Sequence, residues 1–198
     1  MHTNSYDSGD WFNLIDWSGH ATAWDKGLPQ SSGNASAWPL ITTIFADATA
    51  KPAAENIAFA EKHFEELLEI RKSSPLFRLR TDAEVKKRLD FQNGGLDQEP
   101  GVLVMTLADG TCAGADLDPQ RDGIVVVVNA TPSQKQMTVT GATGARLHAV
   151  QMASTDPVEK TASASGEVLT VPARTTAVFE IPQSEGRAGG PPCNTRTP

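Results

Sequence analysis

Residues 122–129 have the sequence DGIVVVVN, and this short run decides the fold of the chain. The segment Ile124 to Val128 is the longest apolar cluster in the sequence. Its length suits a strand, and its apolar residues fall on both faces. We therefore expect a central strand that is buried on two sides.

Further strand-like segments lie on both sides of this run. Turns rich in Gly, Asn, Asp and Pro separate them, and no helical pattern intervenes. This arrangement is typical of an antiparallel β-sandwich, which we expect to be stable by itself over residues 83–182. The expected strands are Val85–Phe91, Val102–Leu107, Ile124–Asn129, Gln136–Val139, Arg146–Val150, Val168–Val171 and Ala177–Ile181.

One long amphipathic helix is predicted over residues 52–72. Its apolar side chains, from Ile57 to Leu68, recur at helical spacing. We expect this stripe to bury against the sandwich or against another scaffold. We expect Glu61 to Glu69 to form a solvated face. Ser73-Ser74-Pro75 then ends the helix.

The two ends of the chain lack a periodic pattern. Residues 1–40 are rich in Asp, Ser, Gly and Asn, and they hold all four tryptophans of the chain. Loops of this kind often cover an active site on a larger scaffold, and we expect the tryptophans to anchor them. The Gly- and Pro-rich residues 184–198 have the composition of a disordered tail.

Charge and hydropathy exclude some classes of partner. The 198 residues carry a net charge of −7, which argues against nucleic acid and against anionic membranes. No apolar run approaches the ~20 residues that span a bilayer. Cys112 lies in a Gly/Asp-rich loop and Cys193 in the tail. We expect two free thiols, with a disulfide between them as the alternative.

Three stretches resemble pullulanases and plant limit dextrinases. The first is NSYDSGDWFN at residues 4–13, and the second includes IRKSSPLFRL at residues 70–79. The third is Val85 to Phe91 with Asn93-Gly94, and further matches lie in the strand-rich region, with DGIVVV at residues 122–127. The resemblance covers roughly residues 4–182.

The resemblance implies a fold that is mainly β. Residues 1–80 would be the end of a catalytic (β/α)8 barrel, containing the active-site loop after strand eight and the final helix. Residues 81–183 would be a C-terminal antiparallel β-sandwich, followed by the disordered tail. The three catalytic carboxylates of the family come from barrel strands four, five and seven, and we expect all three to lie upstream of Met1.

Substrate contacts are expected from the first motif. The resemblance places Asn4, Tyr6, Asp7 and Asp10 at a glucan-binding cleft, where short carboxylates and amides bind sugar hydroxyls. The alternative is that Asp7 and its neighbours only form Asx-type turns. In the longer enzyme the expected partners are an α-glucan, such as pullulan, amylopectin or limit dextrin, and the catalytic barrel.

No cofactor, metal or catalytic residue is expected within these 198 residues. The family can bind calcium, but the pairs Asp7/Asp10 and Asp116/Asp118 do not make a loop with six to eight oxygen ligands. We read these pairs as solvated turns. The histidines, including His63 and His148, show no metal-ligand spacing.

Two functions from different classes remain. The resemblance implies a C-terminal fragment of a debranching enzyme that hydrolyses α-1,6-glucosidic linkages. We expect the fragment to be inactive by itself, because it lacks the nucleophilic carboxylate and the acid/base carboxyl group of a retaining glycosidase. The alternative is a non-catalytic carbohydrate-binding or structural β-sandwich. A branching or isoamylase-type enzyme would lack the motif at residues 4–13.

Overall fold

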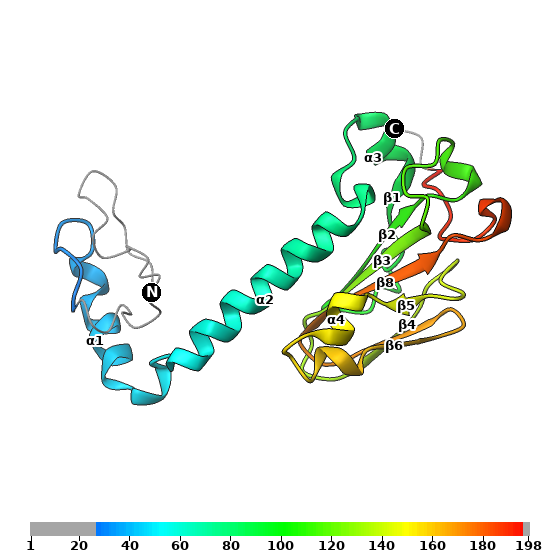
Figure 1. Ribbon diagram of the computed structural model, residues 1–198. Helices are drawn as coiled ribbons and strands as arrows, with labels where there is room; N and C mark the ends of the chain where they lie inside the picture. Colours follow the sequence, from blue (N-terminus) through cyan, green and yellow to red (C-terminus); the bar gives the residue numbers. More distant parts are fainter. Residues whose placement is uncertain (1–26, 196–198) are drawn as a thin grey trace. The chain divides into compact units, whose positions relative to one another are not determined.

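A computed structural model of the chain describes residues 27–195 (Figure 1). The chain divides into two compact units, residues 1–62 and residues 63–198. The division falls within helix α2 (Ala54–Ser73). No helix in the described part of the chain has the length and apolarity needed to cross a bilayer.

The first unit contains helix α1 (Trp38–Ala46) and the beginning of helix α2 (Ala54–Ser73). Short 3-10 turns at Ala35–Ala37 and Ala48–Ala50 flank α1. The indole N–H of Trp38 donates to the carbonyl of Pro29 at 2.9 Å, which fits the expected anchoring role of this tryptophan. The other three tryptophans lie outside the described residues.

Helix α2 confirms the helix expected over residues 52–72, but its faces are used differently. Glu66 and Ile70 are its buried residues. Its apolar stripe remains exposed within the described structure, and Phe64 is 62% exposed. Of the two expected partners of this stripe, the sandwich does not cover the part that lies in the second unit, where Phe64, Leu67 and Leu68 are exposed. The expected solvated face is wrong at Glu66, because that carboxylate binds hydroxyl and amide groups of the β-domain.

Helix α3 (Asp82–Arg88) replaces most of the strand expected at Val85–Phe91, leaving only β1 (Leu89–Phe91). The reason is a capping box. The Thr81 hydroxyl accepts from the Glu84 N–H, and the Glu84 carboxylate accepts from the Thr81 N–H. A 3-10 turn, η5 (Pro75–Arg78), leads into it from α2.

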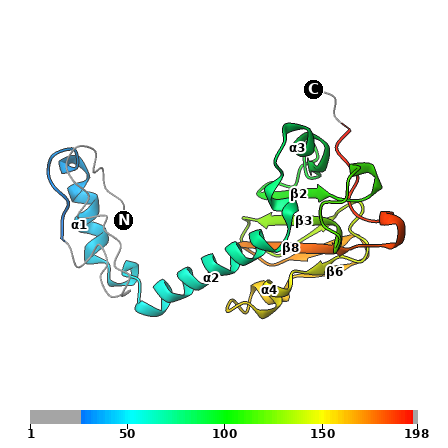
Figure 2. The same cartoon turned by 45° about the horizontal axis from the view of Figure 1, so that its top comes forward.

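Two antiparallel sheets form a sandwich, which confirms the expected fold class (Figure 2). The larger sheet has the order β1-β2-β3-β8-β5, and the smaller has the order β4-β7-β6. The remaining strands are β2 (Val102–Ala108), β3 (Arg121–Asn129), β4 (Lys135–Thr138), β5 (Arg146–Leu147), β6 (Ser163–Ser165), β7 (Val168–Val171) and β8 (Thr175–Pro182).

The strand predicted at residues 146–150 is only partly confirmed. Strand β5 covers Arg146–Leu147, and the chain then turns into helix α4 (Ala149–Ala153). His148 caps this helix, because its Nδ1 accepts from the Val150 N–H at 3.2 Å. The short strand β6 was not expected, since Ser-Ala-Ser carries almost no hydrophobic signal.

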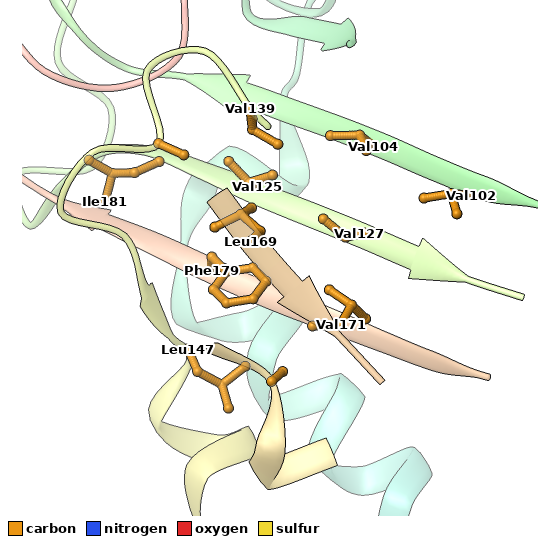
Figure 3. Close-up of a cluster of buried hydrophobic side chains, with 13 residues drawn as sticks. Val102, Val104, Val125, Val127, Val139, Leu147, Leu169, Val171, Phe179 and Ile181 are labelled. Atoms are coloured by element: carbon orange, nitrogen blue, oxygen red, sulfur yellow. The ribbon is translucent and has the colours of Figure 1, made fainter. Parts of the chain in front are cut away.

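Strand β3 is buried on both faces, as the valine run predicts. Val125 and Val127 point into the core between the sheets, where they meet Leu169 from β7 and Phe179 from β8 (Figure 3). Ile124, on the opposite face, packs with Ile70 and Leu76 from the end of α2 and from η5. The domain therefore has two apolar layers, one on each side of the larger sheet.

The tail is ordered over residues 184–195, so the prediction of a disordered tail is wrong there. A disulfide joins Cys112 to Cys193, which also corrects the expected free thiols. The Arg187 side chain donates to the carbonyls of Asp109 and Gly114. At Gly141 a Cβ would overlap the carbonyl of Gly190, so the tail packs against a position that requires glycine. Figure 1 shows the tail, in red, beside the green segment that contains Cys112.

Candidate functional site

The expected sugar-binding residues Asn4, Tyr6, Asp7 and Asp10 lie outside the described residues, so their roles stay predictions. Within residues 63–195, polar side chains gather at three places. The first joins α2 to the loop after α4, the second surrounds Arg121, and the third surrounds Asp109.

The first place is centred on Glu66. Its Oε2 accepts from the Ser154 hydroxyl at 2.7 Å, and its Oε1 accepts from the Thr155 N–H at 3.1 Å. Burial raises the pKa of Glu66. The two hydrogen bonds and His63 together lower it by more than burial raises it, so the pKa lies below the ordinary value for a glutamate. Glu66 is therefore a carboxylate at neutral pH.

Two more potential ligands lie beside this carboxylate. His63 Nδ1 is 3.5 Å from Glu66 Oε2. A carboxylate oxygen of Glu159, from the 3-10 turn η7 (Glu159–Thr161), joins them, and the three ligand atoms lie within 4.8 Å of one another. The cluster combines one imidazole with two carboxylates, a donor set that suits a divalent transition metal.

The Glu159 side chain is fixed by Gln151. The Gln151 amide donates to Glu159 Oε1 and to the Thr176 carbonyl, and its Oε1 accepts from the Val178 N–H. Gln151 itself is fully buried. The other oxygen, Glu159 Oε2, is buried and has no hydrogen-bond partner among the described residues.

A cavity of about 180 Å³ opens at the cluster. Arg174 and Asp156 share its lining with His63 and Glu159. The side of the cluster that faces this cavity can therefore admit a small ligand, a water molecule or an ion.

The second polar place is an ion-pair network around Arg121. Its Nη1 donates to Asp118 Oδ2 at 2.9 Å and its Nε to Glu180 Oε1 at 2.7 Å. Asp118 is 3% exposed and also accepts from the Ser74 hydroxyl, so its expected role as a solvated turn residue is wrong. The network holds the η5 segment on the sheet.

His148 lies beside this network. Its Nε2 is 2.9 Å from the Ser73 hydroxyl and 3.2 Å from Glu180 Oε1, while Nδ1 accepts a backbone N–H. Burial lowers the pKa of His148 and Arg121 lowers it too, which outweighs the opposite effect of Glu180. The imidazole is therefore a neutral cap of helix α4.

Next to Arg121, a cavity of about 280 Å³ is lined by side chains that include Arg146, Met152 and Glu180. Two of its charged groups, Arg121 and Glu180, are paired with each other. Glu180 is the one carboxylate among its described lining residues, so the cavity lacks the pair of carboxyl groups that a glycosidase needs.

The third polar place is the buried carboxylate of Asp109. Arg88 pairs with it and also donates to the carbonyl of Ala115 at 2.6 Å. The N–H groups of Leu117 and Asp118 donate to Asp109 Oδ2 at 3.0 and 2.7 Å. These bonds fix the loop that carries Cys112, so this group has a structural role.

These features define a class of protein domain: an antiparallel β-sandwich, attached to a helix by buried polar contacts, whose polar centres are structural. Residues 19–182 match the family described as alpha-1,6-glucosidases, pullulanase-type, C-terminal. The chain belongs to this family.

Two curated relatives are similar over nearly the whole chain. The pullulanase of Klebsiella pneumoniae is 37% identical over 195 residues, which cover 98% of this chain and 18% of the relative. Pullulanase 1, chloroplastic, of Arabidopsis thaliana is 40% identical over 187 residues, which cover 90% of this chain and 19% of the relative. The chain thus spans about a fifth of the length of these relatives.

Solved structures of relatives have the same fold. The maltotriose complex of PulA from Klebsiella pneumoniae has a TM-score of 0.81 and 41% identity, covering 95% of this chain and 20% of that chain. The structure of PulA from Klebsiella oxytoca has a TM-score of 0.82 and 36% identity, covering 98% of this chain and 18% of that chain.

The cluster of His63, Glu66 and Glu159 was missed in the sequence. Its local signal is the i, i+3 spacing of His63 and Glu66, which puts both side chains on one helix face. Nothing in the sequence links this pair to Glu159, because the fold alone brings η7 to α2.

Proposed function

We propose that this chain is the C-terminal part of a debranching enzyme that hydrolyses α-1,6-glucosidic linkages in an α-glucan such as pullulan. The family membership of residues 19–182 carries this proposal. The match to about a fifth of each longer relative supports the further proposal that the hydrolytic carboxylates belong to other parts of the enzyme.

The exposed side of α2 also supports it. Phe64, Leu67 and Leu68 leave a large apolar surface in contact with solvent in the chain as it stands. Contiguous apolar surface of this kind marks a site of contact with other protein. In the proposed enzyme this surface packs against the catalytic barrel.

Activity of the chain by itself provides the first test. The purified 198-residue chain should release no reducing sugar from pullulan above a buffer blank, because one carboxyl group must protonate the leaving oxygen and another must act as nucleophile. Turnover that is abolished by Asp7→Ala would contradict the proposal, since it would place an active site within this chain.

A chimera provides the second test. The corresponding segment of the Klebsiella pneumoniae pullulanase is replaced by this chain, and we expect the chimera to hydrolyse pullulan. Replacing Leu67 and Leu68 by Asp should lower its activity, because charge in a packed apolar contact is destabilising. The matched control is Leu96→Asp, which changes a fully exposed leucine. A folded but inactive chimera would overturn the proposal.

The same chimera tests the proposed substrate contacts. Asn4→Ala or Asp7→Ala should lower kcat/KM on pullulan by about tenfold or more, the usual effect of losing a hydrogen bond to a charged or strongly polar group. The unfolding temperature should not change. If kcat/KM is unaffected, these residues form turns and do not contact the glucan.

A further inference from the structure

We propose that His63, Glu66 and Glu159 form a binding site for a divalent transition metal, with Zn²⁺ as the preferred ion. The site would connect helix α2 to the turn η7 of the β-domain, so that the ion acts as a structural clasp.

The buried carboxylates carry the argument. Glu66 is 6% exposed and Glu159 is 2% exposed, and their ligand oxygens lie within 4.8 Å of each other and of the imidazole. Two carboxylates that close repel each other and are costly to bury unless a cation compensates them. Glu159 Oε2 has no hydrogen-bond partner in the described part of the chain, although it is buried. A metal ion would satisfy this oxygen.

The distances fit a tetrahedral ion after small side-chain movements. Ligand atoms at about 2.1 Å from a tetrahedral centre lie roughly 3.4 Å apart. The separation of His63 Nδ1 and Glu66 Oε2 is 3.5 Å. Three protein ligands leave a fourth position, and the adjoining cavity of about 180 Å³ has room for water there.

The surrounding hydrogen bonds resemble the outer shell of a metal site. The Ser154 hydroxyl and the Thr155 N–H donate to the Glu66 carboxylate, and the Gln151 amide donates to the Glu159 carboxylate. These hydrogen bonds fix the orientation of both carboxylates. Such partners orient ligands and raise metal affinity. An imidazole ligand favours zinc, nickel or cobalt over calcium, which takes oxygen ligands.

Arg174 is the competing explanation, since it lines the same cavity. A rotated Arg174 could pair with Glu159 and make the ion unnecessary. The two explanations give opposite results for Arg174→Gln. If the ion compensates the carboxylates, this variant binds metal as tightly as the wild type or more tightly. If Arg174 compensates them, the wild-type chain binds no Zn²⁺, and the metal-free variant is less stable than the metal-free wild type.

The experiment uses the full chain, treated with a chelator and then titrated with Zn²⁺ by calorimetry. We expect one saturable ion per chain and a rise in the unfolding temperature, because the ion binds only the folded protein. Substituting Co²⁺ should give the visible absorption of a four-coordinate ion. Ca²⁺ should bind much more weakly.

Two variants and one control locate the ion. His63→Gln and Glu159→Gln should each weaken Zn²⁺ binding by at least about tenfold, as expected for loss of a ligand. Glu69→Gln, which changes an exposed residue on the same helix, should not. Each variant must show the circular dichroism of the metal-free wild type. His63 is the more tolerant position, because its side chain is 34% exposed.

Two results would overturn the proposal. One is the absence of saturable Zn²⁺ binding by the folded wild-type chain. The other is binding that persists in both His63→Gln and Glu159→Gln, since the ion would then lie elsewhere, for example at His2 or His20.

Discussion

Glu66 and His148 are polar residues that a hydrophobicity pattern assigns to the surface, yet both are buried against the β-domain. Each has its hydrogen-bonding atoms satisfied by a particular partner: Ser154 and Thr155 for Glu66, and Ser73 and the Val150 N–H for His148. Buried polar groups are tolerated only when paired in this way. At the scale of the residue, attachment of the end of helix α2 to the β-domain therefore depends on specific hydrogen bonds as well as on apolar burial.

The lowered pKa of His148 predicts a loss of stability in mild acid. The ordinary pKa of histidine is about 6.5, so the unfolded chain takes up a proton there before the folded chain does. The free energy of unfolding should therefore fall as the pH is lowered from about 7.5 to about 5.5. The carboxyl group of Glu66, whose pKa lies below 4.5, does not titrate in this range.

The variant His148→Asn tests this dependence, because asparagine can cap helix α4 without titrating. Urea unfolding at the two pH values should show a smaller loss of stability in the variant than in the wild type. Met152→Ala, which changes an exposed side chain of the same helix, should behave like the wild type. An equal loss in His148→Asn and the wild type would show that another group is responsible.

At the scale of the element, the C-terminal segment is the part of the chain whose structure could not be predicted from its composition. Its glycines and prolines resemble those of a disordered tail. Nevertheless Ser184 and Gly189 donate their N–H groups to Asp122 Oδ2, and the Asn194 N–H donates to the Lys87 carbonyl. Glycine allows this segment to approach the sheet closely, and the Cys112–Cys193 bond closes it onto the domain.

Removing this disulfide should destabilise the domain without changing its fold. Cys112 and Cys193 are 81 residues apart, so the bond restricts the unfolded chain strongly. We expect Cys193→Ser to lower the free energy of unfolding by about 2–4 kcal/mol. Guanidinium unfolding with and without a reductant provides the measurement.

The same variant supplies the control for reduction. Reductant should destabilise the wild type by about as much as Cys193→Ser does, and should leave the variant unchanged. Two thiols that react in the native, unreduced chain would contradict the pairing of Cys112 and Cys193.

At the scale of the whole molecule, the unit that folds is larger than the strand pattern suggests. The sequence led us to expect a stable sandwich over residues 83–182. The structure adds a second apolar layer, in which Ile70 and Leu76 cover the outer face of β3. Losing the burial of one such side chain costs about 2–5 kcal/mol, a large part of the stability of a small domain.

We therefore expect residues 63–198 to unfold cooperatively and residues 83–182 to be unfolded or far less stable. A chain of residues 83–198 separates the contribution of the tail from that of the helix end, since it keeps the tail and lacks Ile70 and Leu76. Thermal circular dichroism and the dispersion of amide NMR signals would report the difference. Equal stability of residues 63–198 and 83–182 would show that the helix end and the tail contribute little.

The sequence by itself determined the sandwich and its centre. A run of valines that is apolar on both faces is typical of a central strand, because only a strand covered on both sides buries all of them. The turn residues around it separate the remaining strands. The long helix also followed from sequence, because Pro75 and the helical spacing are local signals. The motif at residues 4–13 indicated the family, which the match over residues 19–182 confirmed.

Only the tertiary structure decided which face of α2 meets the domain, that Cys112 pairs with Cys193, and that Glu159 lies beside His63 and Glu66. The physical reason is the same for all three. Each depends on contacts between residues far apart in the sequence, and neither helical periodicity nor local turn chemistry carries that information. The apolar stripe dominates the periodic signal of the helix, whereas a buried carboxylate is stabilised by partners that only the complete fold supplies.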